Sequence, residues 1–168
     1  MKLLKYFINF IRYRKEWLYL KYNGFLMKIL CISQNIQIGK NNLFYGCAKF
    51  NVDRGNVIIG DGNKFLSKET SNNIGLNHRC IISATPIEGM SGLLKIGNNC
   101  GFSGVSIWCF NQIVIGNHVR VGAIALIMDG DSHFEDSRFM PPAPIFIKDN
   151  VWIGANAVIK KGVTIGEN

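Results

Sequence analysis

The clearest repeat in the chain is IFIKDNVWIGANAVIKKGVTIG, residues 145–166. Its isoleucines recur every six residues, at Ile147, Ile153, Ile159 and Ile165, and a glycine follows the second and the fourth. A period of six is neither the 3.6-residue period of an amphipathic helix nor the alternation of a half-buried strand. It is typical of a chain that winds into a coil of short flat faces, each of which buries one large side chain.

The six-residue step also appears upstream, in three runs of positions: Ile38, Phe44 and Phe50; Ile96, Phe102 and Trp108; Ile115, Val121 and Ile127. The interval from Trp108 to Ile115 is seven residues, so the register slips once, near Asn111. With three strands per turn, one turn takes about 18 residues, and neighbouring turns stack as parallel strands about 4.8 Å apart. Corners rich in glycine and asparagine suit such a coil because both residues tolerate positive φ.

Two segments interrupt the repeat. Residues 66–93 are irregular and contain the breakers Asn72-Asn73 and Pro86. Residues 128–144, MDGDSHFEDSRFMPPAP, form a polar excursion between two well-kept runs. The repeat therefore predicts the scaffold, and the excursion 128–144 is where we expect the chemistry.

The N-terminal segment has a different pattern. Residues 3–22, LLKYFINFIRYRKEWLYLKY, predict an amphipathic helix that ends at Asn23-Gly24. Residues 1–30 contain seven basic residues and one acid, or +6 of the net charge of +8. Two interpretations are open. We favour a helix that packs over the open end of the coil or on a neighbouring subunit, and the alternative is a helix that lies on an anionic membrane surface.

Composition narrows the class of protein. The remaining residues carry only +2, which argues against a nucleic-acid-binding body. The five cysteines are odd in number and form no C-x-x-C pair, so we expect small buried side chains in a reducing compartment. No cleavable signal peptide or stretch of membrane-span length is evident. We expect a cytoplasmic protein, at most peripheral at the inner membrane face, with a basic helix over residues 1–30 and a coil over residues 31–168.

The stretch 151–159, VWIGANAVI, followed by GVTIG at 162–166, resembles the hexapeptide-repeat acyltransferases, and more narrowly their sugar O-acetyltransferase branch. The resemblance covers about residues 32–168. It implies a left-handed parallel β-helix, a handedness opposite to that of the general crossover rule. It also implies a homotrimer with active sites at the subunit seams. Relatives continue for one or two further turns and close with a segment that contacts the coenzyme, so we expect this chain to lack the C-terminal turns.

The same resemblance implies a catalytic histidine in the excursion loop, often within an Asp-x-Asp-x-His pattern. Here that pattern is Asp129-Gly130-Asp131-Ser132-His133. The implied reaction moves an acetyl group from acetyl-coenzyme A to a carbohydrate hydroxyl of a cell-surface polysaccharide precursor, which is small or lipid-linked. His133 would be the general base, since an imidazole can take the hydroxyl proton and return it to the leaving thiol. Asp131 or Asp129 would hold the ring in the useful tautomer, and the sequence does not choose between them.

The resemblance further implies a coenzyme site. Gly154 and Ala155 match corner positions whose backbone bonds the pantetheine arm, and Trp152 matches a tryptophan that lines the cleft from a neighbouring subunit. Lys160 and Lys161 could approach the coenzyme phosphates. The plainer interpretations are an outward aromatic at Trp152 and a solvated corner at the lysine pair.

No metal site is expected. Phe134 and Met140 occupy the positions at which a calcium loop beginning at Asp129 needs glycine and glutamate. His78, His118 and His133 lack the close pair expected of a zinc trio, and the first two are expected at the surface.

The alternative to an enzyme is a catalytically silent β-helix that acts as an assembly scaffold.

Overall fold

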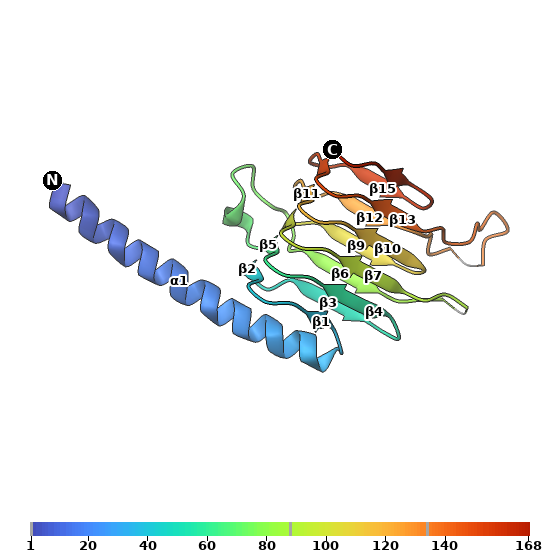
Figure 1. Cartoon of the computed structure of the whole chain (residues 1–168), viewed down its shortest axis with the longest axis horizontal. Helices are drawn as coiled ribbons and strands as arrows, with labels where there is room; N and C mark the ends of the chain where they lie inside the picture. The colour runs from blue at the N-terminus through green and yellow to red at the C-terminus, as the bar shows by residue number, and fades with distance from the viewer. Residues whose placement is uncertain (1, 88, 134) are drawn as a thin grey trace.

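The computed structural model describes residues 2–87, 89–133 and 135–168, and it is a left-handed parallel β-helix preceded by one long helix (Figure 1). Within these ranges the elements are α1 (Lys2–Ser33), β1 (Gln37–Ile38), β2 (Leu43–Tyr45), β3 (Lys49–Val52), β4 (Asn56–Ile59), β5 (Lys64–Leu66), the 3-10 helix η1 (Glu69–Ser71), β6 (Ile81–Ala84), β7 (Leu93–Ile96), β8 (Gly101–Ser103), β9 (Ser106–Cys109), β10 (Gln112–Ile115), β11 (Arg120–Val121), β12 (Leu126–Met128), β13 (Ile145–Ile147), β14 (Trp152–Ile153), β15 (Val158–Lys160) and β16 (Thr164–Ile165).

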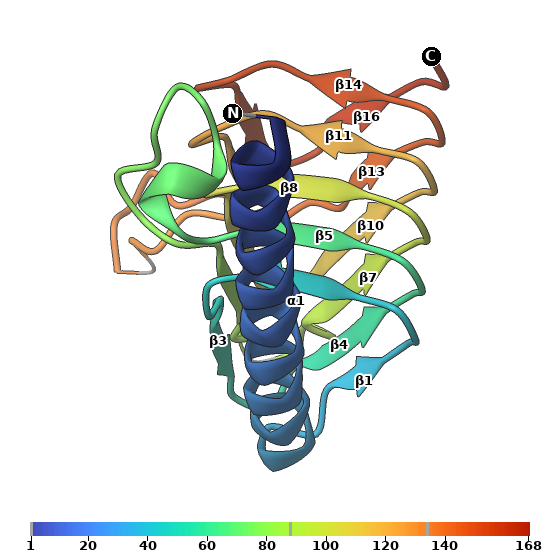
Figure 2. The same ribbon diagram turned by 90° about the vertical axis from the view of Figure 1, so that its left-hand side faces the viewer.

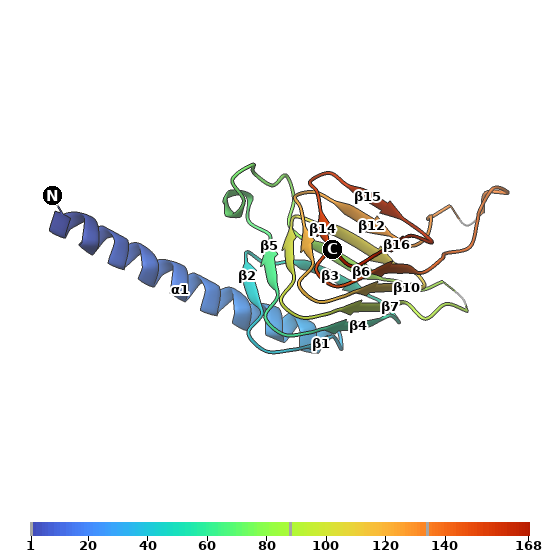
Figure 3. The same cartoon turned by 45° about the horizontal axis from the view of Figure 1, so that its top comes forward.

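The strands are distributed over three parallel sheets in strict rotation. Sheet A has the order β1-β4-β7-β10-β13-β16, sheet B the order β2-β5-β8-β11-β14, and sheet C the order β3-β6-β9-β12-β15. Each strand therefore pairs with the third strand before it and the third after it, and three strands complete one turn of the prism that Figure 3 shows. The predicted three-sided coil is confirmed, and it begins at Gln37, a few residues later than expected.

Stacked columns of similar side chains fill the interior. In sheet A one column consists entirely of isoleucine, paired from turn to turn at positions 38, 59, 96, 115, 147 and 165. In sheet B, Phe44, Phe65 and Phe102 stack with ring centroids 4.9 and 5.2 Å apart and nearly parallel planes. Each turn covers the apolar residues of the turn beneath it, so the core is continuous along the axis.

Sheet C departs from the predicted register at one position. The sequence places Trp108 inward, but the buried column runs Phe50, Ile82, Ile107, Ile127 and Ile159. Trp108 points outward and donates from Nε1 to the Thr85 hydroxyl at 2.7 Å. The corner before β9 is one residue shorter than a regular repeat, so counting in sixes from Phe102 overshoots the inward position.

The corner between sheets A and B is a hydrogen-bonded ladder. On each turn a side-chain oxygen accepts a hydrogen bond from a backbone N–H one turn below, at 2.6–2.9 Å. The acceptor and donor pairs are Asp61 and Lys40, Asn98 and Asp61, Asn117 and Asn98, and Asp149 and Asn117. Inside this corner Asn63 is fully buried, donates to two glycine carbonyls and accepts from the Cys100 N–H at 2.8 Å. These side chains supply the partners that the bent backbone cannot find in the sheets.

Helix α1 does not end at Asn23-Gly24 as predicted, but continues to Ser33. Its second half covers the open lower end of the coil, where Asn23, Met27 and Cys31 are buried (Figure 1). This packing outweighs the cost of a helical glycine, which is about 1 kcal/mol. The helix instead ends in a Schellman turn: Asn35 has φ 54°, and the Ile36 N–H donates to the Cys31 carbonyl at 2.8 Å.

The predicted interruptions are confirmed in outline. The irregular stretch 66–93 holds two loops, 67–80 and 85–92, with β6 between them. The polar excursion leaves the coil after β12 and returns at β13, so it occupies residues 129–144. The loops 85–92 and 129–144 lie at the same corner of the prism, between sheets C and A.

The isoleucine column should dominate stability. We expect Ile115→Ala to lower the free energy of unfolding by about 2–5 kcal/mol, because Ile115 is buried between two other isoleucines. Val114→Ala on the outer face of the same strand should cost less than about 1 kcal/mol. Urea denaturation followed by circular dichroism measures both, and equal losses would contradict the stacked core.

Candidate functional site

The excursion loop is attached to the coil by a buried carboxylate. Asp129 is fully buried, and its two oxygens accept from the backbone N–H groups of Phe110, Asn111 and Gln112 at 2.7–2.8 Å. These three donors lie at the corner between β9 and β10, where the inward positions Ile107 and Ile115 are eight residues apart instead of six. The side chain of Asp129 therefore satisfies the irregular corner beneath it, and the structure does not join it to His133 by a hydrogen bond.

Asp131 is bound to lysines of the next turn. Its carboxylate lies 2.6 Å from Lys161 Nζ and 3.3 Å from Lys160 Nζ, and Lys161 also donates to the Met140 carbonyl at 2.8 Å. The Lys161 ammonium and then Lys160 hold the pKa of Asp131 below its ordinary value. This cluster ties both arms of the excursion loop to β15. Lys160, expected beside coenzyme phosphates, is engaged here with Asp131.

The His133 side chain is exposed near the tip of the loop. Among the described residues, no hydrogen bond or ion pair involves its ring. Ser132, His133, Glu135 and Asp136 line a shallow hollow, in which Asp136 is paired with Arg138 at 2.6 Å. That guanidinium lowers the pKa of Asp136 to about 2. The loop thus presents an imidazole to the outside with neither predicted aspartate bonded to it.

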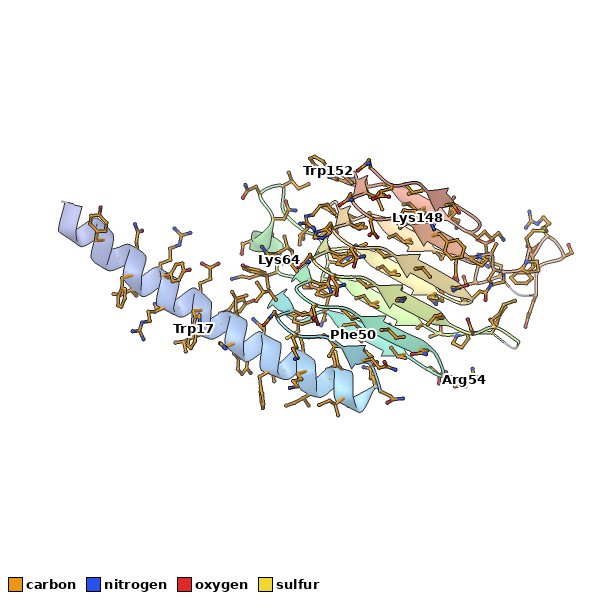
Figure 4. All side chains as sticks on the ribbon, viewed as in Figure 1. Trp17, Phe50, Arg54, Lys64, Lys148 and Trp152 are labelled. Carbon is orange, nitrogen blue, oxygen red and sulfur yellow. The ribbon has the colours of Figure 1, made fainter. Side chains whose placement is uncertain are left out.

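A second part of the predicted site lies on the outer face of sheet B. Lys64, Gly101, Arg120 and Trp152 stand in one row across β5, β8, β11 and β14, in register with one another. They line a groove of about 720 Å³ together with Ala155 and residues of the loop 67–80. Figure 4 shows the labelled Lys64 and Trp152 on the side of the coil from which that loop rises.

The groove combines two cations with an aromatic wall. The Trp152 side chain is 83% exposed. Arg120 donates to the carbonyls of Asn99 and Val119, which holds its guanidinium at the corner and leaves further N–H donors. A Cβ at Gly101 would lie 3.3 Å from Arg120 Cδ, so the missing side chain makes room for the arginine stem. Such a surface suits an elongated, partly anionic ligand.

The structure divides the predicted residues between two places on one chain. Trp152 and Ala155 line the groove on sheet B, with Gly154 at the adjoining exposed corner. His133, Asp131 and Lys160 belong to the excursion loop and the strand beneath it. In Figures 1 and 3 this loop projects on the side away from β5 and the loop 67–80. Within a single chain, therefore, the two groups do not form one cleft.

Sequence reasoning missed the two cations of the groove, Lys64 and Arg120. They are far apart in sequence, and only the strand register across the loops 67–80 and 85–92 aligns them. One feature of the sequence could have identified them: each cation directly follows a buried corner residue, Asn63 before Lys64 and Val119 before Arg120.

The other candidate ligands stay separate. His118 is exposed in a corner with φ 57°, and His78 bonds the neighbouring Arg79 carbonyl, as expected of surface and loop residues. In the described ranges, no three His, Cys, Asp or Glu side chains gather as metal ligands. All five cysteines are free, and burial raises the pKa of Cys31 to about 11 and also raises the pKa values of Cys80 and Cys100.

The anchoring role of Asp129 can be tested by an isosteric change. We expect Asp129→Asn to lower the free energy of unfolding by at least about 2 kcal/mol, because an amide offers one acceptor oxygen to three buried N–H donors. Urea denaturation measures the loss. A stability within error of the parent would remove Asp129 from this role.

Asp131→Asn should behave differently, because the ion pair is partly exposed. We expect a loss below about 1 kcal/mol at neutral pH. The lowered pKa of Asp131 means that its contribution is present above the ordinary aspartate pKa and is lost as the pH falls through the lowered value. The difference between parent and variant should therefore shrink below about pH 4. Unfolding curves across this range would contradict the pairing if the difference grew instead.

Comparison with known proteins agrees with this geometry. Residues 144–168, the last complete turn and its continuation, match the family described as bacterial transferase hexapeptide (six repeats). A 73-residue segment is 38% identical to a Schizosaccharomyces pombe protein that carries the name "putative acetyltransferase". The aligned segment covers 41% of this chain and 33% of the yeast protein. No solved structure matches the chain. The part of the chain that follows the excursion loop is thus similar in sequence to hexapeptide transferases.

Proposed function

We propose that the protein is an acyltransferase that moves an acetyl group from acetyl-coenzyme A to a carbohydrate hydroxyl. The observation that carries this proposal is the position of His133. Its imidazole, which makes no hydrogen bond among the described residues, stands on the polar excursion 129–144, directly before the turn that matches the hexapeptide transferases. The similarity to a protein named as an acetyltransferase supports the same chemistry.

The reaction needs a base, and His133 is positioned to meet an incoming acceptor. Its imidazole takes the hydroxyl proton while the oxygen attacks the thioester carbonyl. The tetrahedral intermediate then collapses, the C–S bond breaks, and the imidazolium returns the proton to the leaving thiolate. A backbone N–H at a coil corner would stabilise the oxyanion. Since Asp129 and Asp131 are engaged elsewhere, the substrate or a neighbouring subunit would fix the ring orientation.

The groove on sheet B is where we place the coenzyme. Its length along β5–β14 suits the extended pantetheine arm; Trp152 and Ala155 line its upper end, and Gly154 lies at the adjoining corner. Lys64 and Arg120 would provide positive charge for the phosphates, a role for which the sequence offered Lys160 and Lys161 as candidates. Arginine in particular can bind phosphate oxygens through two parallel N–H donors.

A homotrimer would bring the two halves of this site together. His133 and the groove lie on different sides of one chain, so a threefold arrangement can place the loop of one copy beside the groove of the next. This supports the expectation of active sites at subunit seams. In this proposal the acceptor is a precursor of a cell-surface polysaccharide, handled in the cytoplasm.

His133→Ala should lower the rate of acetyl transfer by about a hundredfold or more, because the general base is removed. The assay combines acetyl-coenzyme A with a panel of sugars and follows acetylated products by mass spectrometry. His118→Ala, which removes an exposed imidazole from a distant corner, is the matched control and should retain the parent rate.

Two results would count against the proposal. Transfer by His133→Ala within a few-fold of the parent would exclude the imidazole as the base. No detectable binding of acetyl-coenzyme A by calorimetry, with no turnover on any acceptor, would favour the alternative of a catalytically silent scaffold. An Arg120→Gln variant separates the two parts of the site, since it should weaken coenzyme binding and leave the base in place.

A further inference from the structure

The two long sides of α1 have different surroundings. Asn23, Met27 and Cys31 lie on the side that packs against the coil, with exposed fractions of 4%, 1% and 0%. The opposite side carries large apolar residues that nothing covers. We call this the apolar stripe, and it consists of Ile8, Ile11, Leu18, Tyr22, Phe25, Ile29 and Ile32, each between 39% and 70% exposed.

The apolar stripe is long and continuous. Its spacings of three, four and seven residues keep it on one side of the helix, with only Lys15 interrupting it. From Ile8 to Ile32 it extends for about 36 Å at 1.5 Å per residue. A second exposed row, Tyr6, Phe10, Tyr13 and Trp17, follows another side of the projecting half, separated from the stripe by Arg14 and Lys21; Figure 4 shows Trp17 on this part of α1. A surface of this extent needs a partner.

Charge decides which partner fits. Arg12, Arg14, Lys15, Lys21 and Lys28 lie in or beside the stripe, against a single acid, Glu16, on the other side of the helix. Arg14 lies 5.2 Å from the centre of the Phe10 ring, and Lys21 lies 5.5 Å from that of Trp17. No ion pair within the described ranges involves α1. Arg14 and Lys21 are thus held beside exposed aromatics, and no acid among the described side chains pairs with the five cations.

A second copy of the helix would be a poor partner. The stripe has the 3.5-residue spacing of a coiled coil, but the flanking positions are basic and no acid of the opposite helix could pair with them. An anionic lipid surface neutralises all of these cations together and accepts the apolar side chains. Tyrosine and tryptophan favour the interfacial layer, and lysine and arginine can extend to the headgroups.

We infer that α1 is an in-plane membrane anchor, whose apolar stripe binds a bilayer that contains anionic lipids. None of the helices described is long or apolar enough to cross a membrane, so the helix would lie along the surface. The coil would stand on the other side of α1. The inference does not depend on acyl transfer, because its test measures vesicle binding.

The test uses the full chain and vesicles of phosphatidylcholine, with or without about 30% phosphatidylserine. Leu18→Glu places one negative charge in the stripe, and Asn9→Glu places the same charge outside the stripe, between Tyr6 and Tyr13 on the opposite side of the same exposed half. We expect Leu18→Glu to reduce partitioning by about tenfold or more, and Asn9→Glu by less than about threefold. Replacing Arg12, Arg14, Lys15 and Lys21 by glutamine should abolish the preference for anionic vesicles.

Flotation with the vesicles gives the partition coefficient, and circular dichroism checks that each variant keeps its fold. Failure of the parent to float with anionic vesicles would overturn the inference, as would equal effects of the two glutamates. Light scattering without lipid measures the mass of the assembly and tests whether the stripe binds a second copy of the chain instead of a membrane. If Leu18→Glu halves or otherwise lowers the mass of the parent assembly, the stripe joins copies of the chain, and the membrane assignment is wrong.

Discussion

Stacking of like side chains in parallel register holds the turns of this coil together. A single turn cannot bury its own isoleucine or phenylalanine. Each short strand directs one apolar side chain inward, and within that turn only the strands of the other two faces can cover it. Neighbouring turns complete the cover, and the backbone ladder fixes the spacing. The corner between sheets A and B, from Lys40 to Asp149, also holds successive turns together. At each step a carboxylate or amide oxygen accepts a hydrogen bond from a backbone N–H of the turn beneath.

Such a scaffold confines irregularity to the corners. Any residue inserted within a strand would move a whole column out of register, whereas a loop can leave and return at a corner without disturbing either neighbour. The excursion 129–144 does this between β12 and β13. Asp129 fixes the first end of the loop to the coil, and Lys161, which binds both Asp131 and the Met140 carbonyl, joins the two arms to the next turn. The loop can therefore present His133 away from the coil while its ends remain attached to the packed core.

The fold was predictable because its signal is repeated many times. Six-residue spacing identifies most inward positions, and errors arise where a corner changes length, as at Trp108. The end of α1 was not predictable from Asn23-Gly24, because a local stop signal was outweighed by packing of Met27 and Cys31. The sequence identified Asp129 and Asp131 as notable residues of the loop. It could not separate a buried structural carboxylate from a catalytic one, because both are simply aspartates in the sequence. Lys64 and Arg120 could not be aligned until the length of the intervening loops was known.

The arrangement of helix, groove and loop links the two proposals without making either depend on the other. Figure 2 shows α1 passing in front of sheet B, so the groove with Lys64 and Arg120 opens to the side over which the helix projects. The apolar stripe is on the side of α1 that faces away from the coil. A bilayer against this stripe would therefore lie beyond the helix and leave the groove uncovered. An acceptor carried on a lipid would reach such a groove from the membrane, while a soluble donor would enter from the open side.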